Sequence, residues 1–396
     1  MPVSVAYIYV ASLIMIEVAW PSIGINLGNI VAVLASLYII YLALRWRIFG
    51  SIALASQGVV FIFLVMAILY FMSIFWSWDK KSSAIQAIFY FIILLAGIAV
   101  STAGIVNILR AQIVLSFYLA IASFIVIPVA PDIAFQPHSS TGLPELRGVY
   151  KHQQRLGLLM SVSFGIFFIF WWKGQLAQLL GRLYKYRYIF CFTLLMCWVA
   201  AQARSYAVFA ILALVFSLVW SGGVRNRLLI SGFTISVLVA LFIADWSGLQ
   251  DDEITLTGRT IVWAISIEEG LNQLPLGYGF GVFDSSALDS LWGVYRPPHA
   301  HNSFVNIFFE LGIPGILILS MYVVYLTKKL LWSGVSSPSS IVVIFVFVLT
   351  FLASQMGVTL GGKPSFLLYF FMLLSLALYQ YQPTSDVKIA HRFGKP

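Results

Sequence analysis

The chain has 396 residues, of which 61% are hydrophobic and 9% are charged, and its formal net charge at pH 7 is +9. Soluble domains carry about 25% charged residues, so the composition excludes the soluble class. In a membrane protein such a positive excess reflects basic cytoplasmic loops rather than nucleic-acid binding.

The apolar residues come in runs that match a bilayer core of about 30 Å. They predict an all-α polytopic membrane protein with about twelve transmembrane helices, folded as a single membrane domain over residues 1–396. The first run lacks a basic n-region and a clear cleavage site, so it is expected to be retained as a helix. In chain order the expected spans are 3–19, 28–44, 51–76, 85–107, 111–130, 156–172, 188–201, 205–220, 228–244, 303–326, 340–358 and 365–381.

The lysines and arginines predict the orientation. With the N-terminus inside, fourteen of the 23 basic residues fall on the cytoplasmic side, so both termini are expected there. Spans seven and eight are joined so tightly that they could also form one broken helix. In that case the membrane orientation of all preceding spans would be reversed. Polar residues gather in two external loops, a first loop at 131–155 and a large loop with short helices at 245–302.

Basic residues in these loops are notable because positive charge is disfavoured in short external loops. Converging guanidinium groups suit a diphosphate, which they bind in a bidentate way. The alternative is that these side chains snorkel or pair with nearby acids, and both interpretations stay open for Arg155 and Arg296. Arg204 opens a helix at membrane depth, where an unneeded charge is costly, which favours a function. The external set is Arg147, Lys151, Arg155, Arg204, Arg259 and Arg296.

The large external loop contains three further features. Thr257 is a plausible N-cap of a short helix that runs to about Leu271, either as an anion site beside Arg259 or as an amphipathic surface helix. The glycine-rich segment 277–281 lacks the strand and helix of a nucleotide loop, and it is expected to be a flexible loop that could admit a lipid-linked substrate.

The histidine pair closes this loop. On an extended segment His299 and His301 would point to opposite faces, and no carboxylate or cysteine cluster completes a metal site, so no metal is expected. A single histidine acting as acid or base near neutral pH is the favoured interpretation. Glu17 and Glu310 lie inside spans, where a buried glutamate suggests function, although Glu17 could simply reach the interface.

Taken together, these residues resemble the O-antigen ligase and polymerase superfamily. His301-Asn302, nine residues, Gly312, two residues and Gly315 resemble its signature. Three further segments fit in the expected order over residues 140–320, namely 147–157, 203–206 and 257–281. Residues 151–155, Lys-His-Gln-Gln-Arg, depart from the Lys-Asn or His-Asn of relatives, which puts the role of His152 in doubt.

The resemblance implies a membrane glycosyltransferase of the C-type fold in the bacterial inner membrane. Such enzymes use an undecaprenyl-diphosphate-linked glycan at the periplasmic face, with no cofactor and no metal. It implies that Arg204 and Arg259 hold the donor diphosphate and that His301 takes the proton of the acceptor hydroxyl or positions it. Gly312 and Gly315 would allow close packing of span ten. The other expected substrate-binding residues are Arg147, Lys151, Arg155, Arg296, His299 and Asn302.

Three transfer reactions share this chemistry. Residues 257–260 and 277–281 are most similar to the branch that polymerises exopolysaccharide or O-antigen, which makes a polymerase the first expectation. The alternatives are an O-antigen ligase that transfers glycan to lipid A-core and a protein O-oligosaccharyltransferase. A transporter or flippase would place polar groups near the bilayer midplane, often in repeated halves, and neither is visible here. A purely structural subunit would leave the external arginines and histidines unexplained.

Overall fold

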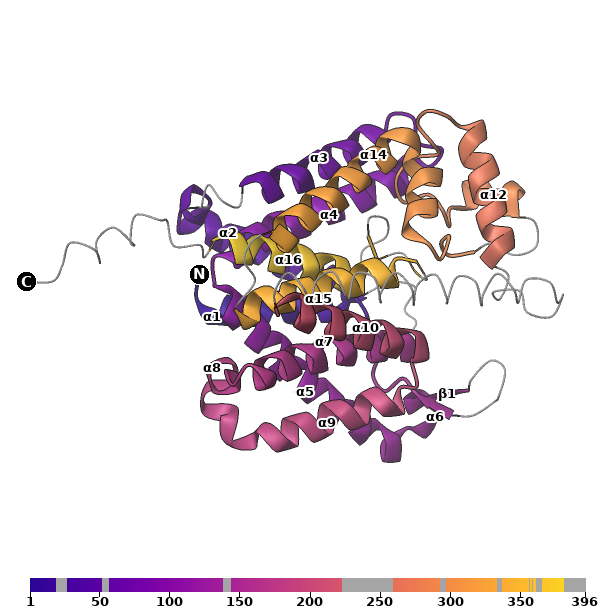
Figure 1. Cartoon of the computed structure of the whole chain (residues 1–396). Helices are drawn as coiled ribbons and strands as arrows, with labels where there is room; N and C mark the ends of the chain where they lie inside the picture. Colours follow the sequence, from indigo (N-terminus) through magenta and orange to yellow (C-terminus); the bar gives the residue numbers. More distant parts are fainter. Residues whose placement is uncertain are drawn as a thin grey trace, which may run out of the picture.

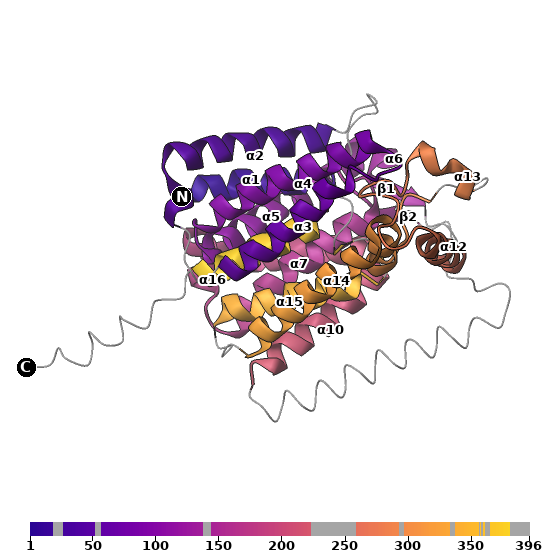
Figure 2. The same ribbon diagram turned by 90° about the horizontal axis from the view of Figure 1, so that it is seen from above.

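Apolar helices that run up and down between two ends make up the protein, as a computed structural model shows (Figures 1 and 2). One short strand pair lies at one end of the bundle. The expected all-α class is therefore confirmed for the part of the chain that the structure describes. That part comprises residues 1–18, 27–51, 57–137, 144–222, 259–292, 297–332, 337–355, 357, 359–360 and 365–380.

The elements have these bounds in chain order: α1 Val3–Met15, α2 Leu27–Arg45, η1 Ile48–Ser51, α3 Gln57–Ser73, α4 Lys80–Ser101, α5 Ile105–Val129, α6 Pro131–Ala134, β1 Phe135–Pro137, β2 Pro144–Leu146, α7 Gln153–Trp172, α8 Leu176–Leu180, η3 Gly181–Tyr186, α9 Arg187–Ala200, α10 Arg204–Trp220, α12 Arg259–Asn272, η5 Ser286–Leu288, α13 Asp289–Trp292, α14 Ser303–Trp332, α15 Pro338–Ala353 and α16 Phe366–Gln380.

Each expected span that falls on described residues coincides with an apolar helix, whereas the ninth, 228–244, lies outside them. Within the described residues, five helices are long and apolar enough to cross a membrane, and five shorter apolar helices accompany them. Apolar side chains on the outer face of α9, such as Phe192 and Val199, are mostly exposed, as expected for a lipid-facing surface. The fold thus supports a multi-pass membrane protein, while the total of twelve spans stays a prediction.

Helices α9 and α10 form a hairpin. The first residue of α9, Arg187, lies beside Trp171 and Leu176 near the end of α7. The end of α10 returns to the same place, since the Nζ atom of Lys173 lies 3.5 Å from the hydroxyl of Ser221. The alternative of a single broken helix across residues 188–220 is therefore wrong.

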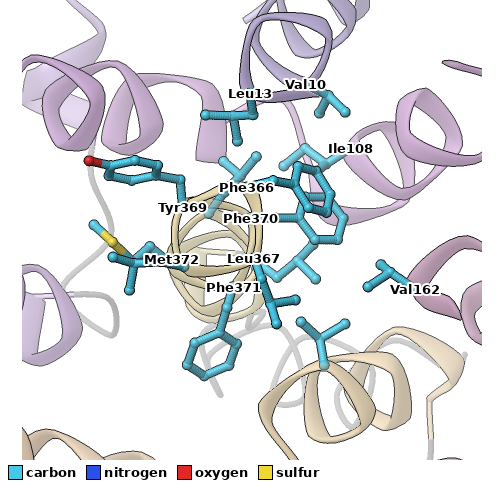
Figure 3. Packing of buried hydrophobic residues seen from close by; sticks show 14 of the residues in the cluster. Val10, Leu13, Ile108, Val162, Phe366, Leu367, Tyr369, Phe370, Phe371 and Met372 are labelled. Carbon is cyan, nitrogen blue, oxygen red and sulfur yellow. The ribbon is translucent and has the colours of Figure 1, made fainter. Parts of the chain in front are cut away.

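Helix α16 is the centre of the bundle (Figure 3). Its residues 366–377 are buried all round, against side chains that include Val10, Leu13, Ile108 and Val162. A helix that is hydrophobic on every face belongs in the interior, where neighbouring helices cover it on all sides. Burial of α16 therefore ties helices from the start and the middle of the chain to one core.

The two ends of the bundle differ in chemistry. At one end, called the cavity end below, α1 finishes while α2, α4, α7, α10 and α12 begin. This end also carries the strand pair, in which Phe135 pairs with Leu146 inside a segment that was expected to be a loop. The opposite end holds basic residues such as Arg45, Lys173 and Arg182, which agrees with the expected charge asymmetry.

Candidate active site

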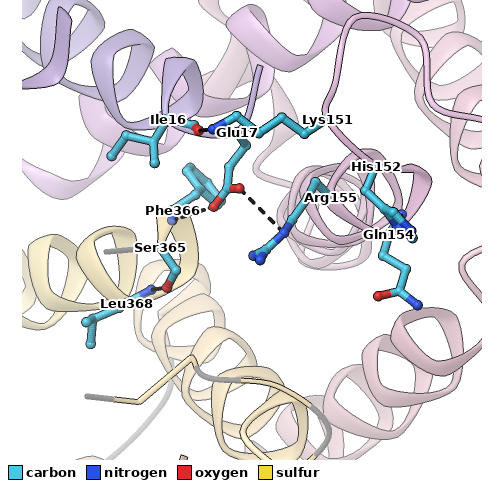
Figure 4. Close-up of polar contacts among 9 residues, drawn as sticks. All are labelled: Ile16, Glu17, Lys151, His152, Gln154, Arg155, Ser365, Phe366 and Leu368. Atoms are coloured by element: carbon cyan, nitrogen blue, oxygen red, sulfur yellow. Dashed lines mark hydrogen bonds and ion pairs between the residues drawn. The ribbon is translucent and has the colours of Figure 1, made fainter. Parts of the chain in front are cut away.

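Hydrogen bonds and an ion pair join the end of α1 to the start of α7 (Figure 4). Val18 and Tyr150 form an antiparallel bridge. The Lys151 backbone N–H donates to the carbonyl of Glu17 at 3.1 Å, and its Nζ atom donates to the carbonyl of Ile16 at 2.8 Å. Arg155, in the first turn of α7, places its Nε atom 3.5 Å from the Glu17 carboxylate. These contacts fix the α1–α7 joint at the floor of a cavity.

Glu17 joins three helices rather than two. One of its carboxylate oxygens faces Arg155, and the other accepts the backbone N–H of Phe366, the first residue of α16, at 3.1 Å. The neighbouring Ser365 hydroxyl accepts the N–H of Leu368 at 3.3 Å, so the α16 terminus is capped by side chains. Only 12% of the Glu17 side chain is exposed, which makes it part of the protein interior rather than an interfacial group.

The histidine pair is brought together by a turn. His301 has φ +55°, a left-handed conformation, and its backbone N–H donates to the Nδ1 atom of His299 at 3.1 Å. The two rings lie edge to face with centroids 4.2 Å apart. The expectation that they point to opposite faces is wrong, because the segment turns at His301 instead of staying extended.

Helix α14 begins directly after this turn. The Oδ1 atom of Asn302 accepts the N–H groups of Phe304 at 2.9 Å and Val305 at 3.3 Å, a helix N-cap. Asn306 accepts the N–H of Ala300 at 3.2 Å. Asn302 therefore fixes the backbone on which His301 sits, while its oxygen is directed at the helix terminus.

A cavity of about 780 Å³ opens where these segments meet. Its described lining contains three cationic side chains and one carboxylate, which leaves two net positive charges when the histidines are neutral. The lining residues are Ile16, Glu17, Asn29, Gln86, Lys151, His152, Gln154, Arg155, Tyr206, Arg259, Pro298, His299, His301, Gly357, Thr359 and Ser365.

Burial and neighbouring cations favour the neutral form of two imidazoles in this cavity, those of His301 and His152. Burial lowers the pKa of His301, and the Arg259 guanidinium lowers it further because it opposes a second positive charge. The pKa of His152 is lowered in the same way, by burial first and then by Arg155 and Arg147. At neutral pH both rings are therefore unprotonated, and His301 can accept a proton.

The structure brings most of the expected site residues into this cavity. Lys151, Arg155, Arg259, His299 and His301 all line it, although they lie up to 150 residues apart in the sequence. Lys151 and Arg155 are, however, bound to α1 as described above, so the pairing considered for Arg155 is present. Arg259, the first described residue of α12, influences both His301 and Tyr206.

Other expected residues lie outside the lining. Arg147 donates from Nε to the carbonyl of Ile133 at 2.8 Å and from Nη2 to that of Asp132 at 3.3 Å. Arg204 is exposed at the first position of α10, two residues before Tyr206, and does not line the cavity. Arg296 and the expected cap Thr257 lie outside the described residues, whereas the expected short helix up to about Leu271 is present as α12.

The glycine-rich segment 277–281 packs differently from the expectation. Tyr278 and Phe280 are buried, and Phe280 stacks on Tyr70 at 3.7 Å between centroids. The Ser73 hydroxyl accepts the Phe280 N–H, and Glu310, fully buried, accepts the N–H of Phe283 at 3.3 Å. The prediction of a flexible loop is wrong, because aromatic burial and these hydrogen bonds anchor the segment to α3 and α14.

Two glycines of α14 have different surroundings. Gly312, at φ +59° and ψ −145°, breaks the helix, and a Cβ there would lie 2.1 Å from the carbonyl oxygen of Pro275. A Cβ on Gly315 would lie 2.5 Å from the Leu311 Cβ in the preceding turn. The close approach expected of these glycines is real at Gly312, but it is made to the 275–277 backbone rather than to a neighbouring helix.

The sequence interpretation missed the neutral polar residues of the cavity. Tyr206 lies in the 203–206 segment, which was singled out for Arg204. The isolated amides and hydroxyls of the apolar helices form no sequence pattern. The one available signal was their cost inside a membrane helix. The missed lining residues with polar side chains are Asn29, Gln86, Gln154, Tyr206, Thr359 and Ser365.

Comparison with known proteins gives the decisive observation. Residues 189–320 match the O-antigen ligase family model, and this range contains Arg204, Arg259 and His301. This part of the chain, about a third of its length, is similar to the O-antigen ligase family. It is also 32% identical over 130 residues to the exopolysaccharide production protein ExoQ of Rhizobium meliloti (strain 1021), which is 29% of this chain and 30% of that protein. The chain thus spans about a third of the length of the curated relative that it matches.

Proposed function

We propose that the protein transfers a glycan from a polyprenyl-diphosphate carrier to a sugar hydroxyl at the periplasmic face of the bacterial inner membrane. The observation that carries this proposal is the juxtaposition of Arg259 and His301 in one cavity with two net positive charges. A diphosphate linked at both ends carries two negative charges, which such a lining would neutralise. The carrier is undecaprenyl diphosphate, as the resemblance of the motifs implies.

In the proposed reaction, neutral His301 accepts the proton of the acceptor hydroxyl as that oxygen bonds to the anomeric carbon of the donor. The bond between the anomeric carbon and the diphosphate oxygen breaks in the same step, and the leaving diphosphate takes the electron pair. Arg259 stabilises the charge that develops on it. Arg204, exposed at the same end, would guide the anionic donor toward the cavity mouth.

The position of the cavity favours transfer over transport. Asn29, Arg155 and Tyr206 each lie in the first turn of their helices, so the polar lining is at one end of the bundle. A transporter binds its cargo near the midplane between repeated halves. A flippase or transporter is therefore the less favoured class.

The product class is proposed to be a polymer of repeat units, as in exopolysaccharide or O-antigen synthesis. The similarity to an exopolysaccharide production protein supports the polymerase. The O-antigen ligase model supports the second candidate, transfer to lipid A-core. A protein O-oligosaccharyltransferase would use the same donor with a serine or threonine hydroxyl.

A deletion strain distinguishes these outcomes. Loss of a polymerase should leave single repeat units on the surface, whereas loss of a ligase should leave bare lipid core with glycan retained on its carrier. Glycan profiles resolved by electrophoresis, with the wild-type gene restored as control, measure the difference. Unchanged surface glycan and unchanged carrier-linked glycan in the deletion strain would contradict the proposed function.

A further inference from the structure

Three primary amides line the cavity from helices outside the matched range 189–320, and besides Gln154 on α7 two of them lie in the N-terminal part of the chain. Asn29 is in the first turn of α2 and Gln86 is in the second turn of α4. Neither residue belongs to the cationic lining or to the histidine pair. The N-terminal part of the chain therefore contributes to the cavity a wall with different chemistry, called the amide wall below.

The start of α2 is fitted closely to the end of α1. A Cβ on Gly28 would lie 2.1 Å from the carbonyl oxygen of Met15, so only glycine permits this approach. Asn29 follows immediately and lines the cavity. Its Oδ1 atom is buried and has no hydrogen-bond partner among the described residues. An amide oxygen that is buried without a protein partner is costly, and such a cost is typical of a residue kept for binding.

Gln86 is held in place by the glycine-rich segment. A Cβ on Gly281 would lie 2.7 Å from Cγ and 3.0 Å from Cβ of Gln86, so the segment packs on the stem of this side chain. The Ser82 hydroxyl donates to the carbonyl of Gly281 at 2.9 Å, and Ser83 donates to that of Phe280 at 2.6 Å. These contacts immobilise the first turns of α4, from which Gln86 lines the cavity.

The chemistry of the amide wall matches sugar hydroxyls. Each primary amide offers one acceptor oxygen and two N–H donors, and a hydroxyl needs both kinds of partner. A neutral amide gains less from a diphosphate than the arginine and lysine side chains of the same cavity do. Within one cavity, the cations thus suit the anionic part of a glycolipid and the amides suit its carbohydrate.

We propose that Asn29 and Gln86 form a sugar-recognition subsite that selects which glycan is transferred. This inference rests on the proposed transfer function and deepens it. The hydroxyls that the subsite binds belong either to the donor sugar next to the diphosphate or to the acceptor sugar. Because a site built to hydrogen-bond a hydroxyl discriminates against analogues that lack it, the subsite would determine specificity.

The test uses the full-length protein in liposomes, with a polyprenyl-diphosphate-linked glycan as donor and a glycan acceptor. Asn29→Leu and Gln86→Met remove the amides at nearly constant volume. Each should raise KM for one sugar substrate about tenfold, the effect of one or two lost hydrogen bonds. A rise for the donor assigns the subsite to the donor sugar, and a rise for the acceptor assigns it to the acceptor sugar.

Deoxy analogues make the test specific. Wild-type protein should use the analogue that lacks the recognised hydroxyl about tenfold less well, and the variant should no longer distinguish the two. Asn107→Leu is the matched control, because it removes an amide from the first turn of α5 at the opposite end, where Asn107 donates to Ala103. This control should behave as wild type.

Two results would overturn the inference. One is unchanged KM values and unchanged discrimination in both variants while the wild type transfers glycan normally. The other is weaker inhibition by sugar-free polyprenyl diphosphate, which would place the amides on the diphosphate instead. If the variants fail to accumulate, Asn29→Gln and Gln86→Asn keep the amide and should still shift selectivity among glycans. Failure of wild-type protein to transfer any glycan would instead contradict the proposed function itself.

Discussion

Two polar segments meet at the cavity and use their charged residues differently. In residues 144–155 the basic side chains bind the protein itself, since Arg147 holds backbone carbonyls next to β1, Lys151 holds the end of α1 and Arg155 pairs with Glu17. In residues 259–301 Arg259 and the two histidines line the cavity together, with Arg259 acting on the pKa of His301. The first segment builds the site, and the second is proposed to carry its chemistry.

The comparison shows why a count of arginines is a poor guide to an anion site. A cation in an external loop of a membrane protein is costly whether it binds a substrate or a helix terminus. Only the partner distinguishes the two uses, and the partner is distant in the sequence. Mutations that separate transfer from folding are therefore the sharpest way to test the difference between the segments.

The largest expected effect is at His301. Loss of the proposed base in His301→Asn should lower kcat about 10²- to 10⁴-fold, the range of general base catalysis. Asparagine tolerates the left-handed conformation that His301 adopts, so the turn should survive. Initial transfer rates with purified protein measure the loss, and an unchanged melting temperature is the control. Wild-type rates in this variant would remove His301 from the chemistry.

Substitution of Arg259 should cause the second-largest loss of kcat. Arg259→Ala should lower kcat about 10²- to 10³-fold, because a positioned donor stabilises the leaving diphosphate in the transition state. Arg259→Lys keeps the positive charge but lacks the planar guanidinium, so its kcat should lie between those of Arg259→Ala and the wild type. Transfer rates at saturating donor are the measurement. Equal rates for all three proteins would contradict the assignment.

The Arg155–Glu17 pair should affect stability more than transfer. Arg155→Gln leaves the largely buried Glu17 carboxylate with one partner fewer, and should destabilise the protein by about 1–2 kcal/mol, between the values for exposed and buried pairs. Because 35% of the Arg155 side chain is exposed, the figure is well below that of a fully buried pair. Unfolding of Arg155→Gln, Glu17→Gln and the double variant gives the coupling energy. A large loss of kcat without loss of stability would assign Arg155 to the diphosphate. It would then contradict the view that the basic side chains of residues 144–155 only build the site.

The smallest expected effect is on pH dependence. The positive charge of Arg259 opposes protonation of His301, so its removal should raise the pKa of that imidazole. His301 would then become protonated at a higher pH, and the acid limb of kcat/KM in Arg259→Gln should shift upward by less than about one pH unit. Residual activity measured across pH 5–8 tests this. A downward shift would mean that another group sets the acid limb.

The sequence predicted much of this molecule for reasons that are local. Apolar runs fix where helices form, and the Arg259 and His301 motifs stand out because polar residues are rare in such a chain. The turn that joins His299 to His301 was not predictable, since it depends on the N-cap at Asn302 and on packing of Ala300. Asn29 and Gln86 were missed because single amides have no periodicity, and their place in the cavity depends on Gly28 and Gly281.

The bond between Glu17 and Phe366 has a consequence for biosynthesis. It joins residues 349 positions apart, so the floor of the cavity is incomplete until α16 has entered the bundle. A nascent chain that has inserted its earlier helices but not α16 would therefore not yet bind a glycolipid. Chains truncated before Ser365 should insert in the membrane yet fail to protect their α1–α7 joint from proteolysis, whereas protection equal to that of the intact chain would show that the joint closes independently.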